Sequence, residues 1–318
     1  MYKEPIFLKP VFQERIWGGQ KLQTEYGYNI PFEHTGEAWV ISAHPNGPSI
    51  IENGSLAGKT LKDAWETHGE LFNKQSDNEE AYPLLIKILD ANDDLSVQVH
   101  PDDTFAREVE NVPYGKTECW YVLSAEPGAE LVLGHCAKTR EELAAMMDNG
   151  KWGKLLQRVP VKAGDFYYVP SGTIHAIGKG TVILETQQSS DITYRVYDYD
   201  RVNVEGNKRE LHLDRAKEVT TVPHKPASSD HITEIHGGLT SEKLVATDYF
   251  SVYRWQLNGT ANMNMEANFL QVSVISGNAE IMVGDKRYPL KKGVHFVLPY
   301  GIGEYKLTGE AEIVASHE

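Results

Sequence analysis

The sequence predicts a mostly β protein, a sandwich or barrel architecture with a small helical insertion. Two observations support this prediction. Short runs rich in β-branched and aromatic residues are separated by glycine and proline, which is typical of many short strands joined by turns. A spacing of glycine and proline near the middle of the chain also recurs near its end, so one β unit is expected twice.

The clearest strand candidates are apolar runs bounded by turn residues. They are residues 37–41, 84–89, 182–184 and 269–275. Helices are expected at only two places. Apolar residues at three-and-four spacing predict an amphipathic helix over 61–72, and Thr139 with Glu142 forms a capping box that opens a helix ending at Asn149 and Gly150. We therefore expect residues 136–158 to be a helical excursion from the β core.

The repeated unit has the spacing glycine, five residues, proline, one residue, glycine, two residues and a polar residue. The first copy is Gly164, Pro170, Gly172 and His175, and the second copy is Gly293, Pro299, Gly301 and Glu304. Glycine and proline suit the turn, and the alternation before it predicts a strand. Because the second copy ends in Glu304 and no histidine pair precedes it, only the first copy is expected to bind metal.

The repeat suggests a division of the chain. Residues 1–220 are expected to form the catalytic, metal-binding domain that includes the helical excursion. The polar stretch 221–240 is expected to be a linker. Residues 241–318 are expected to form a degenerate β domain without metal ligands.

Composition limits the classes of function. The chain has 318 residues, of which 41% are hydrophobic and 24% charged, and its net charge is −14. No signal pattern and no apolar run of membrane-spanning length is present, and Cys119 and Cys136 are too few for a disulfide framework, so a soluble cytoplasmic protein is expected. The acidic balance opposes binding to nucleic acid or anionic membranes. An anionic substrate would need a locally basic pocket, and protein partners are not predictable.

Four polar residues indicate a metal site. Gln98 and His100 are two residues apart, so in a strand both side chains face the same way. Glu118 and His175 add a carboxylate and a second imidazole. Nitrogen and oxygen donors of this kind suit zinc or a similar divalent ion, and three or four protein ligands with an open position are typical of catalytic sites. Gln98 could instead orient water or substrate, since a neutral amide is a poor zinc ligand.

The first copy of the repeat resembles the second conserved motif of the cupin superfamily, whose fold is a double-stranded β-helix barrel. Gln98 stands where one histidine of the first cupin motif is usual, and this departure, with several further runs, resembles type I mannose-6-phosphate isomerase. The runs are residues 17–19, 36–39, 83–89, 95–101, 115–120 and 193–198. The resemblance extends from about residue 5 to residue 210 and implies two cupin-type jelly-roll barrels.

The resemblance also implies roles for single residues. One zinc ion per chain would be held by Gln98, His100, Glu118 and His175. Arg195 would be the catalytic arginine, Arg201 would hold the phosphate, and Ser96 and Lys116 would contact the substrate. The chain departs from longer members of the family in having little room for their large helical insertion, and Lys116 is flanked by Gly115 and Thr117.

The implied reaction interconverts mannose 6-phosphate and fructose 6-phosphate through an enediol. Zinc would act as a Lewis acid that stabilises negative charge on the sugar oxygens, and Arg195 would stabilise the same oxygens or orient the sugar. Removal of the carbon-bound proton suits Glu185 or Lys116, which the sequence does not rank. Arg201, Lys116 and Ser96 would bind the phosphate.

Other interpretations stay open at this point. Glu185 could satisfy a hydrogen bond in the core, and Arg195 and Arg201 could belong to a structural ion-pair network. The chain could be a cupin dioxygenase, which needs redox-active iron, or a noncatalytic cupin that binds a sugar. Fold analogy alone does not choose among these functions.

Overall fold

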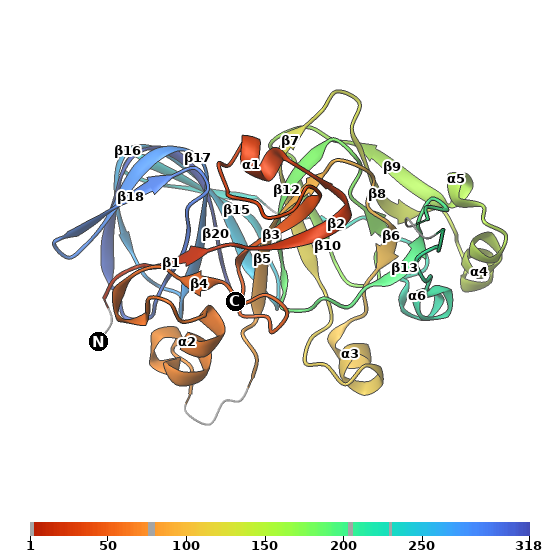
Figure 1. The fold of residues 1–318 in the computed structure, drawn as a ribbon, viewed down its shortest axis with the longest axis horizontal. Coiled ribbons are helices and arrows are strands. Elements are labelled where there is room, and N and C mark those ends of the chain that lie inside the picture. The colour runs from red at the N-terminus through yellow and green to blue at the C-terminus, as the bar shows by residue number, and fades with distance from the viewer. Residues whose placement is uncertain (1–2, 76–79, 203–205, 229–230) are drawn as a thin grey trace.

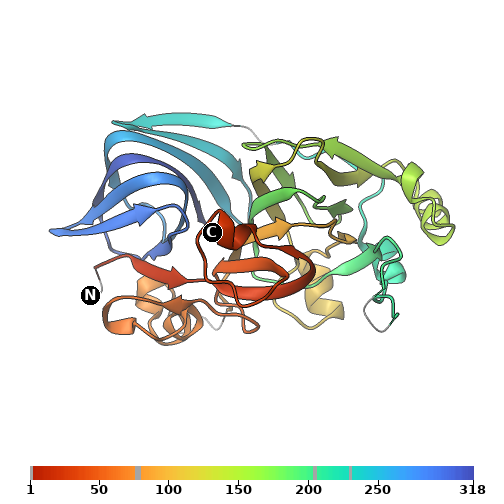
Figure 2. The same cartoon turned by 45° about the horizontal axis from the view of Figure 1, so that its top comes forward.

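The computed structural model describes residues 3–75, 80–202, 206–228 and 231–318, and most of its regular structure is β. Its strands form three sheets of nine, six and five strands. Figures 1 and 2 show two β-rich regions side by side, with the C-terminal strands in blue at one end of the molecule. Strand pairing within the described ranges closes none of these sheets into a barrel.

Two of the sheets belong to the first 200 residues. The six-stranded sheet contains β2 (Val11–Gly19), β3 (Thr35–Ile41), β5 (Leu84–Ala91), β7 (Glu118–Ala125), β10 (Phe166–Val169) and β12 (Thr181–Gln188). The five-stranded sheet contains β6 (Val97–Val99), β8 (Glu130–His135), β9 (Leu156–Pro160), β11 (His175–Ala176) and β13 (Tyr194–Tyr197). The strands predicted at 37–41, 84–89 and 182–184 are confirmed.

An apolar cluster packs these two sheets against each other. Trp120 of β7 and Ile183 of β12 belong to this cluster, as does Leu131 of β8 on the other sheet. All three side chains are buried. The layer between the two sheets is therefore one core of this half of the molecule. Polar side chains lie at the ends of the strands, where they can form a site.

The nine-stranded sheet is formed mainly by the end of the chain. It contains β14 (Ile232–His236), β15 (Leu239–Ala246), β16 (Ser251–Asn264), β17 (Leu270–Val283), β18 (Lys286–Lys291), β19 (His295–Leu298) and β20 (Glu304–His317). Two early strands, β1 (Ile6–Lys9) and β4 (Ile50–Ile51), complete it, and β1 pairs antiparallel with β19. The predicted strand 269–275 corresponds to the start of β17. A second core of buried side chains fills the interior of this region.

One strand lies where the sequence predicts a linker. Residues 232–236 form β14, an edge strand that pairs with β15, and every residue of β14 is exposed. A strand without a buried face has no apolar alternation, so composition alone does not separate it from a loop.

The helices are short and lie at the periphery. They are α1 (Lys21–Thr24), α2 (Leu61–Thr67), α3 (Asp103–Val109), α4 (Arg140–Asp148), α5 (Trp152–Leu155) and α6 (Leu213–Val219). The helix predicted over 61–72 is two elements, because α2 ends at Thr67 and a 3₁₀ turn over Gly69–Phe72 follows His68, whose ψ of 50° is not helical. No helix of the described residues has the length and apolar character of a membrane span.

The helix predicted to begin at Thr139 is confirmed as α4. The Thr139 side chain accepts a hydrogen bond from the backbone N–H of Glu142. The Glu142 carboxylate accepts from the backbone N–H of Lys138, not from that of Thr139, at 2.7 Å. Half of the predicted capping box is thus present, and the second half is shifted by one residue.

The repeated unit has the same backbone conformation in both copies. Its first glycines, Gly164 and Gly293, have φ of +87° and +84°, and its second glycines, Gly172 and Gly301, have φ of +80° and +79°. This left-handed conformation favours glycine. The four-residue strands β10 and β19 each begin two residues after the first glycine. The sequence repeat is therefore a structural repeat.

Candidate active site

Three predicted metal ligands meet where three strands of the first half begin or end. His100 directly follows β6, Glu118 is the first residue of β7, and His175 is the first residue of β11. All three side chains are buried, and their donor atoms lie within 4.8 Å of one another. Gln98 of β6 lies opposite His175 in the β6–β11 pairing. The structure thus brings distant parts of the chain to one point.

Hydrogen bonds to the backbone fix the tautomer of both histidines. His100 Nδ1 lies 2.7 Å from the carbonyl oxygen of Ile192, and His175 Nδ1 lies 2.8 Å from that of Thr173. Because a carbonyl oxygen only accepts, Nδ1 carries the hydrogen and Nε2 presents a lone pair. Burial lowers the pKa of both imidazoles, which favours the neutral form that binds metals.

The lone pairs face the carboxylate of Glu118. His175 Nε2 lies 3.3 Å from Glu118 Oε1, and His100 Nε2 lies 3.7 Å from Glu118 Oε2 and 3.2 Å from Lys116 Nζ. Both His175 Nε2 and Glu118 Oε1 are buried and lack a hydrogen-bond partner within the described ranges. Acceptors that face one another without a proton between them are unfavourable unless a cation lies there. The three side chains therefore fit a divalent metal ion held by nitrogen and oxygen donors.

A cleft of about 470 Å³ opens beside this group. Its lining includes five residues that the sequence predicts for the site, and several others that it does not. The predicted residues are Ser96, Gln98, Lys116, Glu185 and Arg195, and the others include Arg15, Glu37, Trp39, Lys87, Asp191 and Arg209. The cleft therefore lies next to the metal ligands and carries many charges.

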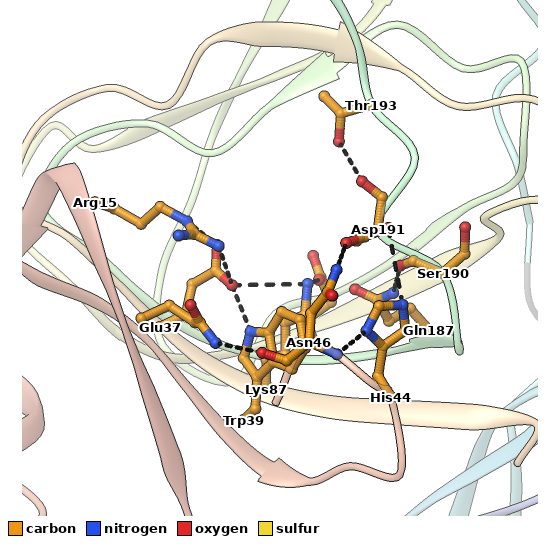
Figure 3. A network of polar contacts seen from close by, with 12 residues as sticks. Arg15, Glu37, Trp39, His44, Asn46, Lys87, Gln187, Ser190, Asp191 and Thr193 are labelled. Atoms are coloured by element: carbon orange, nitrogen blue, oxygen red, sulfur yellow. Dashed lines mark hydrogen bonds and ion pairs between the residues drawn. The ribbon is translucent and has the colours of Figure 1, made fainter. Parts of the chain in front are cut away.

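Charges of opposite sign alternate along one wall of the cleft, as Figure 3 shows for its outer part. Arg15 Nε lies 2.9 Å from Glu37 Oε1, and Lys87 Nζ lies 3.8 Å from Glu37 Oε2 and 3.6 Å from Glu185 Oε1. Lys116 Nζ continues the row, 3.8 Å from Glu185 Oε1 and 2.7 Å from Glu118 Oε2. The row connects the rim of the cleft to the metal ligands.

The two carboxylates of this wall differ in their affinity for protons. Burial raises the pKa of Glu37, but Lys87 and Arg15 outweigh burial and lower it to about 2. Burial and the nearby Glu118 raise the pKa of Glu185. Glu185 Oε2 accepts a hydrogen bond from Trp120 Nε1 at 3.1 Å, whereas its Oε1 has no hydrogen-bond partner among the described residues.

Sequence reasoning missed Glu37 and Lys87 as site residues. Both lie in runs that the sequence predicts as strands, and the structure shows both almost fully buried. A charged residue inside an otherwise apolar strand is rare unless it is paired, and this is the signal that could have found them. Lys87 also lies 5.1 Å from the centre of the Trp39 ring.

The two predicted arginines have different environments. Arg195 of β13 lines the cleft, and its Nη1 donates to the carbonyl oxygen of Glu210 at 2.8 Å. Arg201 is not among the cleft-lining residues; its Nη2 lies 2.6 Å from Asp198 Oδ1 and its Nη1 donates to the carbonyl oxygen of Asp94. The ion-pair network considered from the sequence is therefore present at Arg201.

Comparison with known proteins decides the family. A family model described as phosphomannose isomerase type I, catalytic domain, matches residues 6–123, and one described as mannose-6-phosphate isomerase, cupin domain, matches residues 240–318. The chain is 52% identical to mannose-6-phosphate isomerase ManA of Bacillus subtilis over 318 residues, which cover 100% of both chains. The chain belongs to the type I phosphomannose isomerase family.

Further relatives agree with this family. The mannose-6-phosphate isomerase of Streptococcus mutans is 51% identical, with 99% of this chain and 98% of that protein covered. A crystal structure of the mannose 6-phosphate isomerase from Bacillus subtilis matches with a TM-score of 0.95 and 49% identity over 99% of each chain. The apo form of the enzyme from Salmonella typhimurium, 17% identical over 100% of each chain with a TM-score of 0.78, shares the fold. The family resemblance read from the sequence is confirmed.

Proposed function

We propose that the chain is a zinc-dependent aldose–ketose isomerase that interconverts mannose 6-phosphate and fructose 6-phosphate through an enediol. The observation that carries this proposal is the buried group of His100, Glu118 and His175 beside a charged cleft. Gln98 completes a ligand set for one zinc ion per chain. When bound, the ion supplies a Lewis acid that stabilises negative charge on the sugar oxygens.

The isomerisation moves one proton between C2 and C1 of the sugar. We assign this transfer to Glu185, because its Oε1 is buried in the wall of the cleft and has no hydrogen-bond partner among the described residues. Its carboxylate takes the proton from C2 and returns it to C1, while the hydroxyl proton moves from O2 to O1, so the enzyme is unchanged after turnover. Lys116 is ion-paired with Glu118 at 2.7 Å, which suits an ammonium group that donates hydrogen bonds to the sugar.

The remaining side chains of the cleft orient the substrate. Arg195 presents a permanently charged guanidinium that stabilises developing negative charge on oxygen. Ser96 lies in the same lining and offers a hydroxyl to the sugar. Cations gathered in the cleft explain how a chain with a net charge of −14 binds a phosphorylated hexose.

A coupled assay on metal-quantified protein tests the proposal. We expect conversion of each sugar phosphate into the other without oxygen, loss of turnover on chelation, and recovery on addition of Zn²⁺. Turnover that requires oxygen would instead indicate a cupin dioxygenase. Binding of the sugar phosphate without conversion by the metal-loaded protein would indicate a noncatalytic cupin.

We also propose that residues 1–220 and 241–318 are two cupin-type barrel domains joined by 221–240, the second without metal ligands. In this division β1 and β4 of the first domain and β14 of the joining segment complete the sheet of the second domain. The repeated unit and the cupin-domain match over 240–318 support this division. The group of potential metal-binding side chains found in the described residues lies in the first half.

A further inference from the structure

Three arginines and one aspartate form a cluster at and after β13. Asp198 is buried and accepts hydrogen bonds from Arg209 Nε at 2.7 Å and Arg209 Nη2 at 2.5 Å. Its Oδ1 also accepts from Arg201 Nη2 at 2.6 Å. Arg201 also lies 3.5 Å from Asp93 Oδ2, so Arg195 and Arg209 are the cations of this cluster that line the cleft. Two guanidinium groups beside one buried carboxylate leave a net positive charge, which attracts a phosphate monoester that carries about −1.5 to −2 at neutral pH.

Arg201 is turned away from the cleft by a tight turn. Tyr199 and Asp200 both have φ of +56°, and the backbone N–H of Arg201 donates to the carbonyl oxygen of Asp198 at 3.0 Å. This conformation costs free energy for residues other than glycine, so the surrounding contacts must hold it. The Arg201 guanidinium donates to Asp198 and to the carbonyl oxygen of Asp94, and lies 5.2 Å from the Tyr199 ring centre. Each of its three guanidinium nitrogens therefore already has a protein partner.

Arg209 is directed into the cleft by the segment that carries it. The backbone N–H of His212 donates to the carbonyl oxygen of Arg195, and the backbone N–H of Arg195 bonds to His212 Nδ1. Arg195 Nη1 donates to the carbonyl oxygen of Glu210. These bonds fasten residues 209–212 along β13, and both Arg195 and Arg209 line the cleft.

Both arginines retain donors for a ligand. An arginine has five N–H groups, and Asp198 engages only Nε and Nη2 of Arg209. Nη1 of Arg209 has no protein partner in the part of the chain that the structure describes. Nε of Arg195 is buried and likewise lacks a hydrogen-bond partner there. A buried, unpartnered guanidinium nitrogen next to a second guanidinium is a site built for an anion.

We infer that Arg209, beside Arg195, binds the phosphate group of the substrate and sets the preference for phosphorylated over neutral sugars, with Asp198 as its positioning residue. Arg201, which the sequence resemblance assigned to the phosphate, serves the fold of the loop instead. This inference rests on the proposed function, since the phosphate belongs to the substrate of that reaction.

Isothermal titration calorimetry of the zinc-loaded full chain with inorganic phosphate tests the inference. It measures the Kd for phosphate and does not depend on turnover. We expect Arg209→Gln to raise the Kd for phosphate roughly 10- to 100-fold, the range for loss of a charge-assisted hydrogen bond. Lys208→Gln is the matched control. It also removes one positive charge, but Lys208 is exposed and is not among the residues that line the cleft. It should change the Kd by less than about 3-fold, since its charge is screened by solvent.

Arg201→Gln separates the two assignments. Under the inference it changes the Kd for phosphate less than Arg209→Gln does. A loss in Arg201→Gln as large as that in Arg209→Gln, or an unchanged Kd in Arg209→Gln, overturns the assignment. Thermal unfolding checks that each variant folds, and Arg209→Lys, which keeps the charge but loses the two-bond contact with Asp198, replaces Arg209→Gln if that variant does not.

Kinetics distinguishes this inference from the proposed function. In an active isomerase, Arg209→Gln should raise KM for mannose 6-phosphate by the same factor as the Kd and change kcat less than about 3-fold, since uniform binding is lost. Absence of isomerase activity in the wild-type chain would contradict the proposed function, whereas the measured Kd values for phosphate would still be valid. A KM in Arg209→Gln equal to that of the wild type would contradict only the assignment of the phosphate to Arg209.

Discussion

The two copies of the repeated β unit share a backbone and differ in chemistry. Their glycines have nearly equal φ, and each copy leads a four-residue strand into the same turn. The first copy then places His175 in a buried position, whereas the second places Glu304 in an exposed one. Turn residues therefore conserve the shape of the unit, and one position at its end decides whether a metal ligand is delivered.

The difference continues ten residues after the end of each copy, on β12 in the first case and on β20 in the second. Ten residues after His175 lies Glu185, whose carboxylate lines the cleft. Ten residues after Glu304 lies Val314, which is buried among apolar side chains. The first copy has polar side chains at positions that are buried. Burying a polar group lowers the stability of the fold, so such groups are useful only where a ligand or a reaction needs them.

The largest effect on metal binding and turnover is expected from His175→Ala, which removes the metal ligand that the second copy lacks. Metal affinity should fall roughly 100-fold or more, because loss of a group that merely orients a ligand already costs about 10- to 100-fold. Turnover should fall with the metal. Elemental analysis and the isomerase assay measure both, with Glu304→Ala as the matched change in the second copy. A full metal equivalent in His175→Ala would contradict the ligand assignment.

Glu185→Gln tests the second polar position of the first copy. Turnover should fall by about 10²- to 10⁴-fold, the usual contribution of a general base, while the metal content stays that of the wild type. Retained metal separates a failed proton transfer from a damaged metal site. Near-normal turnover in this variant would remove Glu185 from the reaction and leave Lys116 as the candidate.

His295 gives the second copy a buried histidine that is no metal ligand. Its Nδ1 lies 2.9 Å from Ser273 Oγ and its Nε2 lies 2.7 Å from the Tyr28 hydroxyl. Burial lowers the pKa of His295 to about 3. As the pH falls from about 6.5 towards 3, the unfolded chain binds a proton there and the folded chain does not.

The contribution of His295 to stability is therefore complete above pH 6.5 and decreases below it, by up to about 1.4 kcal/mol per pH unit. Urea unfolding of the wild type and of His295→Gln at pH 6.5 and pH 4.5 measures the difference. The variant should lose less stability between these pH values. Equal losses in both proteins would show that His295 is not buried in its neutral form.

The smallest effect is expected from alanine at the first glycine of each copy. The left-handed φ should cost Gly164→Ala and Gly293→Ala about 1 to 2 kcal/mol each in free energy of unfolding. A Cβ at Gly293 would also lie 3.3 Å from the Tyr26 carbonyl oxygen and the Tyr28 ring, whereas none of the described atoms crowds one at Gly164. Denaturant unfolding should rank Gly293→Ala as the less stable variant, and the reverse order would show that crowding does not matter there.

The sequence predicts the parts of the site that depend on local spacing. Gln98 and His100 can be paired because alternation within one strand orients them, and Thr139 can be identified because capping is local. Arg209 cannot be found in this way, since its role depends on hydrogen bonds that fasten residues 209–212 to β13. The orientation of Arg201 depends on a turn formed by Tyr199 and Asp200, two residues that do not usually adopt positive φ.

The fold follows the same division. Apolar runs with turn residues around them predict strands, whereas the polar composition of 221–240 predicts a linker and does not reveal β14, which has no buried face. The pairing of β1 with β19 joins residues 291 positions apart, Ile6 and Val297, and no local pattern reports a contact of that separation. Tertiary pairing, not strand propensity, was the information missing from the sequence.

The same pairing has a consequence for biosynthesis. β1 is translated long before β19, the partner that covers one of its two edges. Until then β1 presents unpaired backbone N–H and C=O groups to neighbouring nascent chains, and edges of this kind promote aggregation. A fragment that begins at residue 241 would expose the complementary edge of β19. The edge of β1 is thus closed late in synthesis, because its partner strand lies far along the chain.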